Sequence, residues 1–95
     1  MKWMEFIKVR TTGAEDRLRA LNFLNAVQNS PGEPGLMETK IYVHSSYIGD
    51  LSIAFYRDND EPISMYSELA LLVVNELKKM GFVHHSIWLE KGEGT

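Results

Sequence analysis

The chain contains no cysteine. This absence excludes disulfides, thiolate nucleophiles and cysteine-based zinc or iron–sulfur sites. Long apolar runs are also missing, since the longest extends only from Leu69 to Val74 and a bilayer span needs roughly 20 residues. The apolar start of the chain is interrupted by Glu5, which is not the pattern of a signal peptide. By elimination, we expect a cytoplasmic protein with no membrane association.

Motifs that bind cofactors or metals are absent from the sequence. It contains no glycine-rich phosphate loop, no serine elbow and no metal-binding helix motif. Positive charge is also scarce, with 10 Lys and Arg against 13 Asp and Glu and a formal net charge of −3. Because neutralising phosphates supplies much of nucleic-acid affinity, this balance disfavours a nucleic-acid partner. We expect no cofactor and no metal.

The composition is that of one small globular domain. The 95 residues are 44% apolar and 24% charged, and no linker or repeat divides them. We therefore predict a single domain over residues 1–95, with 91–95 as a frayed tail. A chain of this length builds a limited core, and self-association is a common way to bury further apolar surface.

The hydrophobic pattern predicts four strands and two helices. Alternating side chains predict strands over residues 2–11, 37–46, 51–57 and 82–90. Apolar residues at helical spacing predict one helix that starts at a capping box of Thr12 and Glu15 and ends before Pro31. A second helix is expected to start in the turn at 58–62 and to end near Met80, before Gly81.

The order β-α-β-β-α-β is that of the ferredoxin-like fold, in the α+β class. Each crossover contains a helix and can join its strands in the right-handed sense. We predict a four-stranded antiparallel sheet in the order 4-1-3-2, with both helices on one face. The other sheet face is then uncovered in a single chain.

The uncovered face is predicted to be rich in aromatic side chains. Strand alternation places six candidate ligand-binding or interface residues there: Phe6, Tyr42, His44, Tyr56, His84 and Trp88. A solvated sheet face is normally polar, and an exposed apolar patch usually marks a partner surface. We therefore predict that this face meets a partner or a ligand.

The element order and the segment Glu33-Pro34-Gly35-Leu36, which leads into a β-hairpin, resemble the dimeric α/β-barrel superfamily. That superfamily includes antibiotic-biosynthesis-type monooxygenases and related small ligand-binding proteins. The resemblance implies a homodimer in which two sheets pack face to face and close a barrel. It transfers no catalytic residue to this chain.

The histidines do not predict a metal site within one chain. His84 and His85 are adjacent on a strand, so their side chains point to opposite faces. His44 and His84 share a face but belong to the two outer strands, which lie roughly 14 Å apart across three strand spacings. Only a dimer interface could bring them together. His85 is expected at the edge of the core on the helix-covered side.

Glu76 is the acidic residue with the most unusual predicted position. A helical wheel places it within an apolar arc that includes Leu69, Leu72 and Leu77. A desolvated carboxylate there would have a raised pKa and could act as a general base. Alternatively, Glu76 lies at the edge of the arc and pairs with Lys or Arg. Glu76 and His85 are therefore the two catalytic candidates.

Three functional hypotheses are compatible with the sequence. The first is a homodimeric α/β-barrel protein that binds a small apolar or aromatic molecule, as a cofactor-free monooxygenase or isomerase. The second is a non-catalytic binding or regulatory module that uses the aromatic face. The third, an RNA-binding domain of the same element order, is disfavoured because residues 50–57 lack the basic-glycine-aromatic signature of its third strand.

Overall fold

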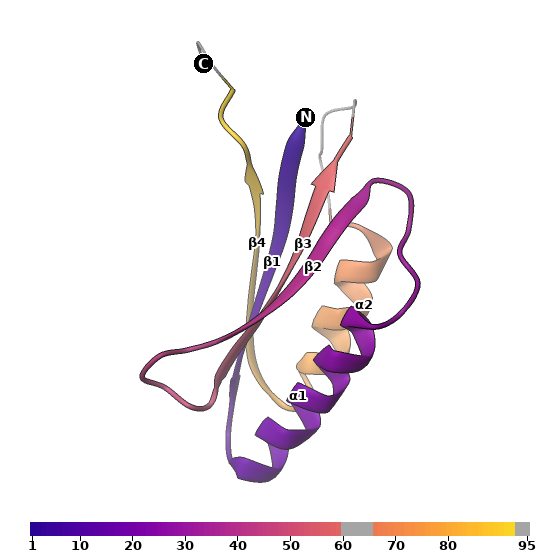
Figure 1. Ribbon diagram of the computed structural model, residues 1–95. Coiled ribbons are helices and arrows are strands. Elements are labelled where there is room, and N and C mark those ends of the chain that lie inside the picture. The colour runs from indigo at the N-terminus through magenta and orange to yellow at the C-terminus, as the bar shows by residue number, and fades with distance from the viewer. Residues whose placement is uncertain (60–65, 93–95) are drawn as a thin grey trace.

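The computed structural model describes residues 1–59 and 66–92 (Figure 1). Its elements follow the predicted β-α-β-β-α-β order. They are β1 (Lys2–Thr11), α1 (Ala14–Gln28), β2 (Leu36–Val43), β3 (Asp50–Asp58), α2 (Glu68–Leu77) and β4 (Gly81–Leu89). The ferredoxin-like fold predicted from the sequence is confirmed.

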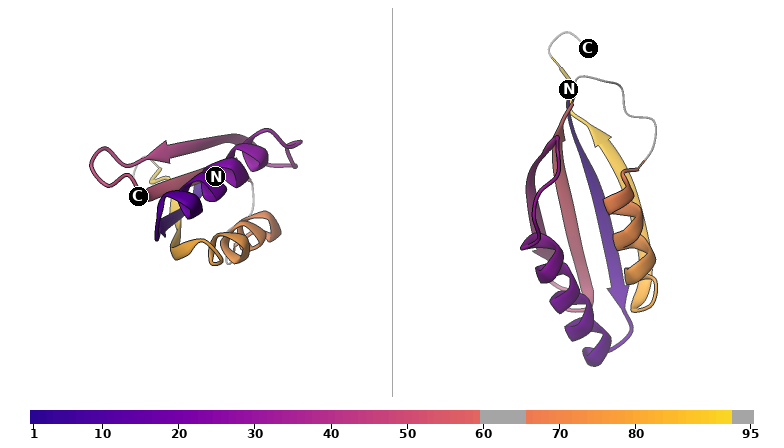
Figure 2. Two further views of the ribbon diagram at one scale, coloured as in Figure 1. Left: turned by 90° about the horizontal axis from the view of Figure 1, so that it is seen from below. Right: turned by 90° about the vertical axis from the view of Figure 1, so that its right-hand side faces the viewer.

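The four strands form one antiparallel sheet in the order β2-β3-β1-β4. This is the predicted order 4-1-3-2, read from the other edge. The register between β2 and β3 shifts between Leu36 and Glu38, which marks a bulge near the start of β2. Helices α1 and α2 cover the same face of the sheet, and the opposite face carries no helix from the described residues (Figure 2).

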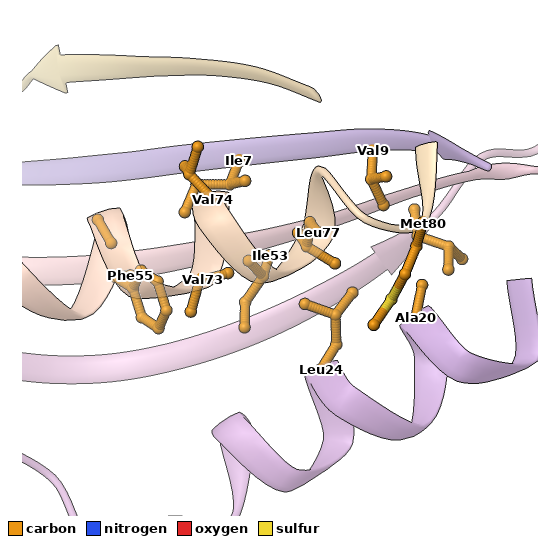
Figure 3. Packing of buried hydrophobic residues seen from close by; sticks show 12 residues of the cluster. Ile7, Val9, Ala20, Leu24, Ile53, Phe55, Val73, Val74, Leu77 and Met80 are labelled. Carbon is orange, nitrogen blue, oxygen red and sulfur yellow. The ribbon is translucent and has the colours of Figure 1, made fainter. Parts of the chain in front are cut away.

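The core lies between the helices and the odd-numbered side chains of β1 and β3. Ile7, Ile53 and Phe55 are fully buried there, and Leu24 of α1 and Leu77 of α2 pack against them (Figure 3). The predicted alternation in β1 is therefore correct. Because successive strand residues point to opposite faces, the even-numbered side chains face away from the helices.

The two helix starts differ from the predictions. Helix α1 begins after Gly13, which makes no side-chain cap, and Thr12 lies one residue outside the cap position, where its hydroxyl donates to the Asp16 carboxylate at 2.8 Å. The capping box of Thr12 and Glu15 was therefore a wrong prediction.

Helix α2 begins at Glu68, later than expected. Its cap is Ser67, whose hydroxyl oxygen accepts the backbone N–H of Ala70 at 3.1 Å. The start predicted in the turn at 58–62 was therefore wrong, and residues 60–62 of that turn lie outside the described part of the chain.

Two glycines meet a local requirement of the backbone. Gly35, just before β2, has a φ of 84°, which favours glycine. Gly81 starts β4 directly opposite Thr11, and a Cβ at this position would overlap the backbone carbonyl of Arg10. Gly81 therefore allows the close approach of β4 to the end of β1.

Neither helix in residues 1–59 and 66–92 combines the length and apolar character that crossing a membrane requires.

Candidate functional site

The sheet face that points away from the helices is the candidate functional surface, and we call it the open face. The strand register places its side chains in rows across the four strands. These rows are Glu38–Tyr56–Met4–Trp88, Lys40–Ala54–Phe6–Ser86, Tyr42–Ser52–Lys8–His84 and, at the far end, Asp50–Arg10–Phe82. By this register, Phe6, Tyr42, Tyr56, His84 and Trp88 occupy open-face positions, whereas His44 follows the end of β2.

A hollow of about 680 Å³ lies at the end of the sheet where β1 begins. Its lining includes Met4, Tyr56 and Trp88 from neighbouring strands, together with Met37 and Glu38 from the start of β2. Trp88 is 59% exposed, so a large part of its ring is in contact with solvent. The hollow thus combines aromatic and methionine surface with charged residues of both signs, since its lining also includes Lys2, Arg57 and Glu90.

Two tyrosine hydroxyls form a polar pair next to the hollow. The Tyr42 and Tyr56 oxygens are 2.7 Å apart, and the Lys40 ammonium lies 5.9 Å from the centroid of the Tyr56 ring. The hydrogen bond to Tyr42 raises the pKa of Tyr56, and burial of the phenol acts in the same direction. The Tyr56 phenol therefore stays protonated at neutral pH. The pair needs one of its two O–H groups for the mutual bond, which leaves the other able to donate elsewhere.

The opposite end of the open face carries a nearly buried carboxylate. Asp50 accepts two bonds from the Arg10 guanidinium, at 2.9 and 3.0 Å, and its carboxylate lies 3.4 Å from the Lys8 ammonium. These partners, led by the hydrogen bond from Arg10, lower the pKa of Asp50 to about 2. The cluster connects β1 to β3 across the open face.

We expect the Asp50→Asn variant to show a pH-dependent loss of stability. Because the pKa of Asp50 is lowered from 3.8 to about 2, its carboxylate stabilises the fold fully above about pH 4 and loses this effect as the pH falls toward 2. The difference in unfolding free energy between wild type and variant should therefore shrink from pH 6 to pH 2. Urea unfolding at several pH values measures it, with Glu15→Gln on the exposed surface of α1 as the charge-matched control. A difference independent of pH would contradict this role.

The predicted separation of His44 and His84 is present in the structure. His44 follows β2 at one edge of the sheet, and its Nδ1 accepts the backbone N–H groups of Ser46 and Tyr47, both at 3.0 Å. His84 lies on β4 at the other edge, in the same row as Lys8. Across residues 1–59 and 66–92, no three His, Asp or Glu side chains are grouped so that they could hold a metal ion.

The catalytic candidates Glu76 and His85 lie on the helix-covered side, away from the hollow. The Glu76 side chain is 39% exposed, and its carboxylate lies 3.1 Å from the Lys79 ammonium. Of the two positions considered for Glu76, the structure therefore shows the one at the edge of the apolar arc, paired with a lysine. Leu72 is exposed, so the predicted apolar arc was wrong at that position. His85 is exposed rather than at the edge of the core, and its ring lies 4.5 Å from that of Tyr66. A catalytic role for Glu76 or His85 stays a prediction.

A buried charged cluster beneath α2 was not predicted from the sequence. Glu5 is completely buried and accepts bonds from Arg57 Nε at 2.7 Å and from the backbone N–H of Ser67 at 2.7 Å. Arg57 also pairs with Glu33 of the loop before β2 and lies over the Trp3 ring. The sequence contained one sign of this cluster, because strand alternation places Glu5 and Arg57, which have opposite charges, on the inward-facing side. The cluster holds the start of α2 and the loop before β2 against the sheet.

Comparison with known proteins identifies the fold but no family. No protein-family model matches the chain, and no curated protein matches it. Among solved structures, Rv0793 from Mycobacterium tuberculosis is 14% identical over the whole of both chains, with a TM-score of 0.73.

Two further solved structures share the fold. A dimeric ferredoxin-like protein from an uncultured marine organism is 16% identical over 99% of this chain and 91% of its own, with a TM-score of 0.61. SnoaB, a cofactor-independent oxygenase from Streptomyces nogalater, is 8% identical over 98% of this chain and 96% of its own, with a TM-score of 0.63. At such low identities the likeness shows a shared fold and nothing more. The resemblance to the dimeric α/β-barrel superfamily predicted from the sequence is therefore confirmed as a resemblance of fold.

Proposed function

We propose that the chain forms a homodimer through its open face and binds a small apolar or aromatic molecule in the hollow. The hollow itself is the observation that carries this proposal, since Met4, Tyr56 and Trp88 of its lining lie on a sheet face that neither α1 nor α2 covers. Its volume of about 680 Å³ is within the range of roughly 300–1,000 Å³ that is usual for small-molecule sites.

The exposed aromatic residues support pairing of the open faces. Trp88, Phe82 and Tyr42 are all exposed at open-face positions, where a solvated antiparallel sheet normally carries polar side chains. Large apolar residues gathered on one face are typical of an interface, and aromatic anchors dominate interface energetics. That a protein of the same fold is described as dimeric adds support for this arrangement.

The chemistry of the hollow favours a flat apolar ligand with a polar substituent. Tyr56 and Trp88 supply ring surfaces for stacking, and the Met4 thioether can adapt to an irregular shape. The tyrosine pair adds one O–H donor, and Glu38 adds an acceptor. Such a site binds and orients its ligand chiefly by shape.

We extend the proposal to a reaction on the bound molecule without a resident cofactor, either oxygenation or isomerisation. The support is the shared fold with an oxygenase described as cofactor-independent. The protein would contribute mainly by orienting the ligand and excluding water. A ligand in the hollow does not reach Glu76 or His85, so any role for those residues requires a second site on the helix-covered side.

A titration with 2-naphthol tests the binding proposal. We expect saturable quenching of the tryptophan emission, with one molecule bound per chain, and an affinity about fivefold lower in Tyr56→Leu because ring stacking contributes on the order of 1 kcal/mol. Leu72→Ala, on exposed helix surface, is the control and should bind like wild type. If Tyr56→Leu and Leu72→Ala bind 2-naphthol with equal affinity, or if the wild-type titration does not saturate, the hollow is not a binding site for this ligand. Binding without turnover would leave the non-catalytic module predicted from the sequence.

A further inference from the structure

The segment between β2 and β3, residues 44–49, projects from one end of the sheet, and we call it the arm. Figure 1 shows it bending to the side opposite the helices, and the view from below in Figure 2 agrees. The arm therefore extends beyond the open face on the side that a second sheet would occupy.

Hydrogen bonds at both ends hold the arm in this shape. The Gly49 carbonyl accepts the Thr11 backbone N–H and hydroxyl, both at 2.9 Å, and the Ile48 carbonyl accepts Arg17 Nε at 2.7 Å. Within the arm, His44 Nδ1 accepts two backbone N–H groups. A loop fixed in this way loses little conformational entropy when it binds.

The tip of the arm presents apolar side chains to solvent. Tyr47 is 62% exposed and Ile48 is 75% exposed. The Tyr47 ring is nevertheless held in place, because it lies 4.9 Å from the His44 ring and 5.7 Å from the Arg10 guanidinium. A rigid tip that carries an oriented tyrosine and an isoleucine is suited to contact apolar protein surface.

The arm and the hollow lie at opposite ends of the same face. The hollow is beside Met4 near the start of β1, whereas the arm bonds to Thr11 at its end. We consider a two-fold axis that lies between two face-to-face sheets and runs perpendicular to their strands. Each end of one sheet then lies over the opposite end of the partner sheet, and the two β2 edges lie on the same side of the dimer. Each arm then comes over the hollow of the other copy.

We propose that the two copies exchange arms, so that Tyr47 and Ile48 of one protomer cover the hollow of its partner beside Met37 and Tyr56. This proposal depends on the homodimer of the preceding section. In this arrangement Arg10 at the base of the arm comes to the same end of the open face as the partner's Glu38. Arg10 pairs with Asp50 and Glu38 with Lys40 within one chain, and the side chains of Arg10 and Glu38 are both more than half exposed, so each can still face an opposite charge. The binding site is then complete only in the dimer, and a ligand in it strengthens association of the two copies.

Cysteine cross-linking tests the exchange directly, because the native chain has no cysteine. In the double variant Ile48→Cys/Met37→Cys, the two new thiols are at opposite ends of one chain and meet only between copies. We expect this variant to give mostly disulfide-linked dimer on mild oxidation, at least tenfold more than either single variant. Tyr47→Cys/Glu38→Cys repeats the test at a neighbouring pair, so that one poorly oriented pair does not decide it.

The controls separate failure of the exchange from failure of the dimer. Leu72→Cys, on exposed helix surface, gives the background of random cross-linking. Cross-linking by Ile48→Cys alone would mean that the two arms meet each other, and would overturn the exchange. A protein that is dimeric by light scattering but cross-links at neither pair would overturn it as well. A protein that is monomeric at every concentration would overturn the homodimer itself.

Discussion

The Arg57→Met variant is expected to lose about 3–5 kcal/mol of unfolding free energy, the usual cost of breaking a buried ion pair by removing one partner. Glu5 is completely buried, and Arg57 is its only cationic partner among the described residues. Without the guanidinium, the bonds from Ser67 remain but no positive charge balances the carboxylate. Urea unfolding monitored by circular dichroism measures the loss.

Two further variants show whether the uncompensated charge is the cause. Glu5→Leu combined with Arg57→Met removes both charges, and we expect this double variant to be more stable than Arg57→Met alone. Lys79→Met breaks the exposed pair with Glu76 and should cost less than about 1 kcal/mol. An Arg57→Met variant as stable as Lys79→Met would show that the buried cluster does not hold α2 to the sheet.

The Phe6→Asp variant is expected to weaken dimerisation at least about 30-fold, as loss of a central interface residue costs roughly 2 kcal/mol or more. Phe6 lies in the second row of the open face, between Ala54 on β3 and Ser86 on β4. In a face-to-face dimer, a carboxylate at this position would be buried without a partner. Analytical ultracentrifugation of wild type and variant measures the change in dissociation constant.

Leu72→Asp is the matched control, because it places the same charge on an exposed leucine of α2. It should leave the dissociation constant within about twofold of wild type, well below the tenfold change that 1.4 kcal/mol produces. The urea midpoint of each variant shows whether the fold is intact. If Phe6→Asp folds normally and dimerises like Leu72→Asp, the open face is not the interface.

The strands and their faces could be predicted from the parts of each strand in which apolar and polar residues alternate. In β1 this is the second half, where Ile7 and Val9 alternate with Lys8 and Arg10, and burying Ile7 and Val9 fixes which face meets the helices. The sheet order followed from the element order and the handedness of the crossovers. These rules concern topology, and they were sufficient to place the aromatic side chains on one face.

The helix predictions were weaker because they depended on single side chains. Thr12 and Glu15 have the spacing of a capping box, but the chain turns at Gly13 and places Thr12 one residue too early. The helical wheel placed Leu72 in the apolar arc, whereas the docking of α2 on β1 and β4 leaves it exposed. A wheel gives relative directions around a helix but does not show which direction meets the sheet.

The hollow and the buried cluster could not be predicted, since both depend on three-dimensional placement. The hollow forms where the bulge between Leu36 and Glu38 brings the start of β2 beside Tyr56. The pairing of Glu5 with Arg57 requires the register that aligns Trp3 with Arg57 across β1 and β3. Charged residues are usually found at the surface, so the sequence alone does not indicate that Glu5, which interrupts an apolar stretch, is buried.

Light scattering after size-exclusion chromatography, over a range of concentrations and with tryptophan emission recorded, tests the pairing of open faces most directly. Trp3 is buried whereas Trp88 is 59% exposed, so a change in emission on dilution reports chiefly on Trp88. We expect a mass twice the 10.9 kDa of one chain at high concentration. On dilution, the emission should shift to the red in parallel with the appearance of monomer. A mass of one chain at every concentration, with unchanged emission, would contradict the proposal that the open faces meet.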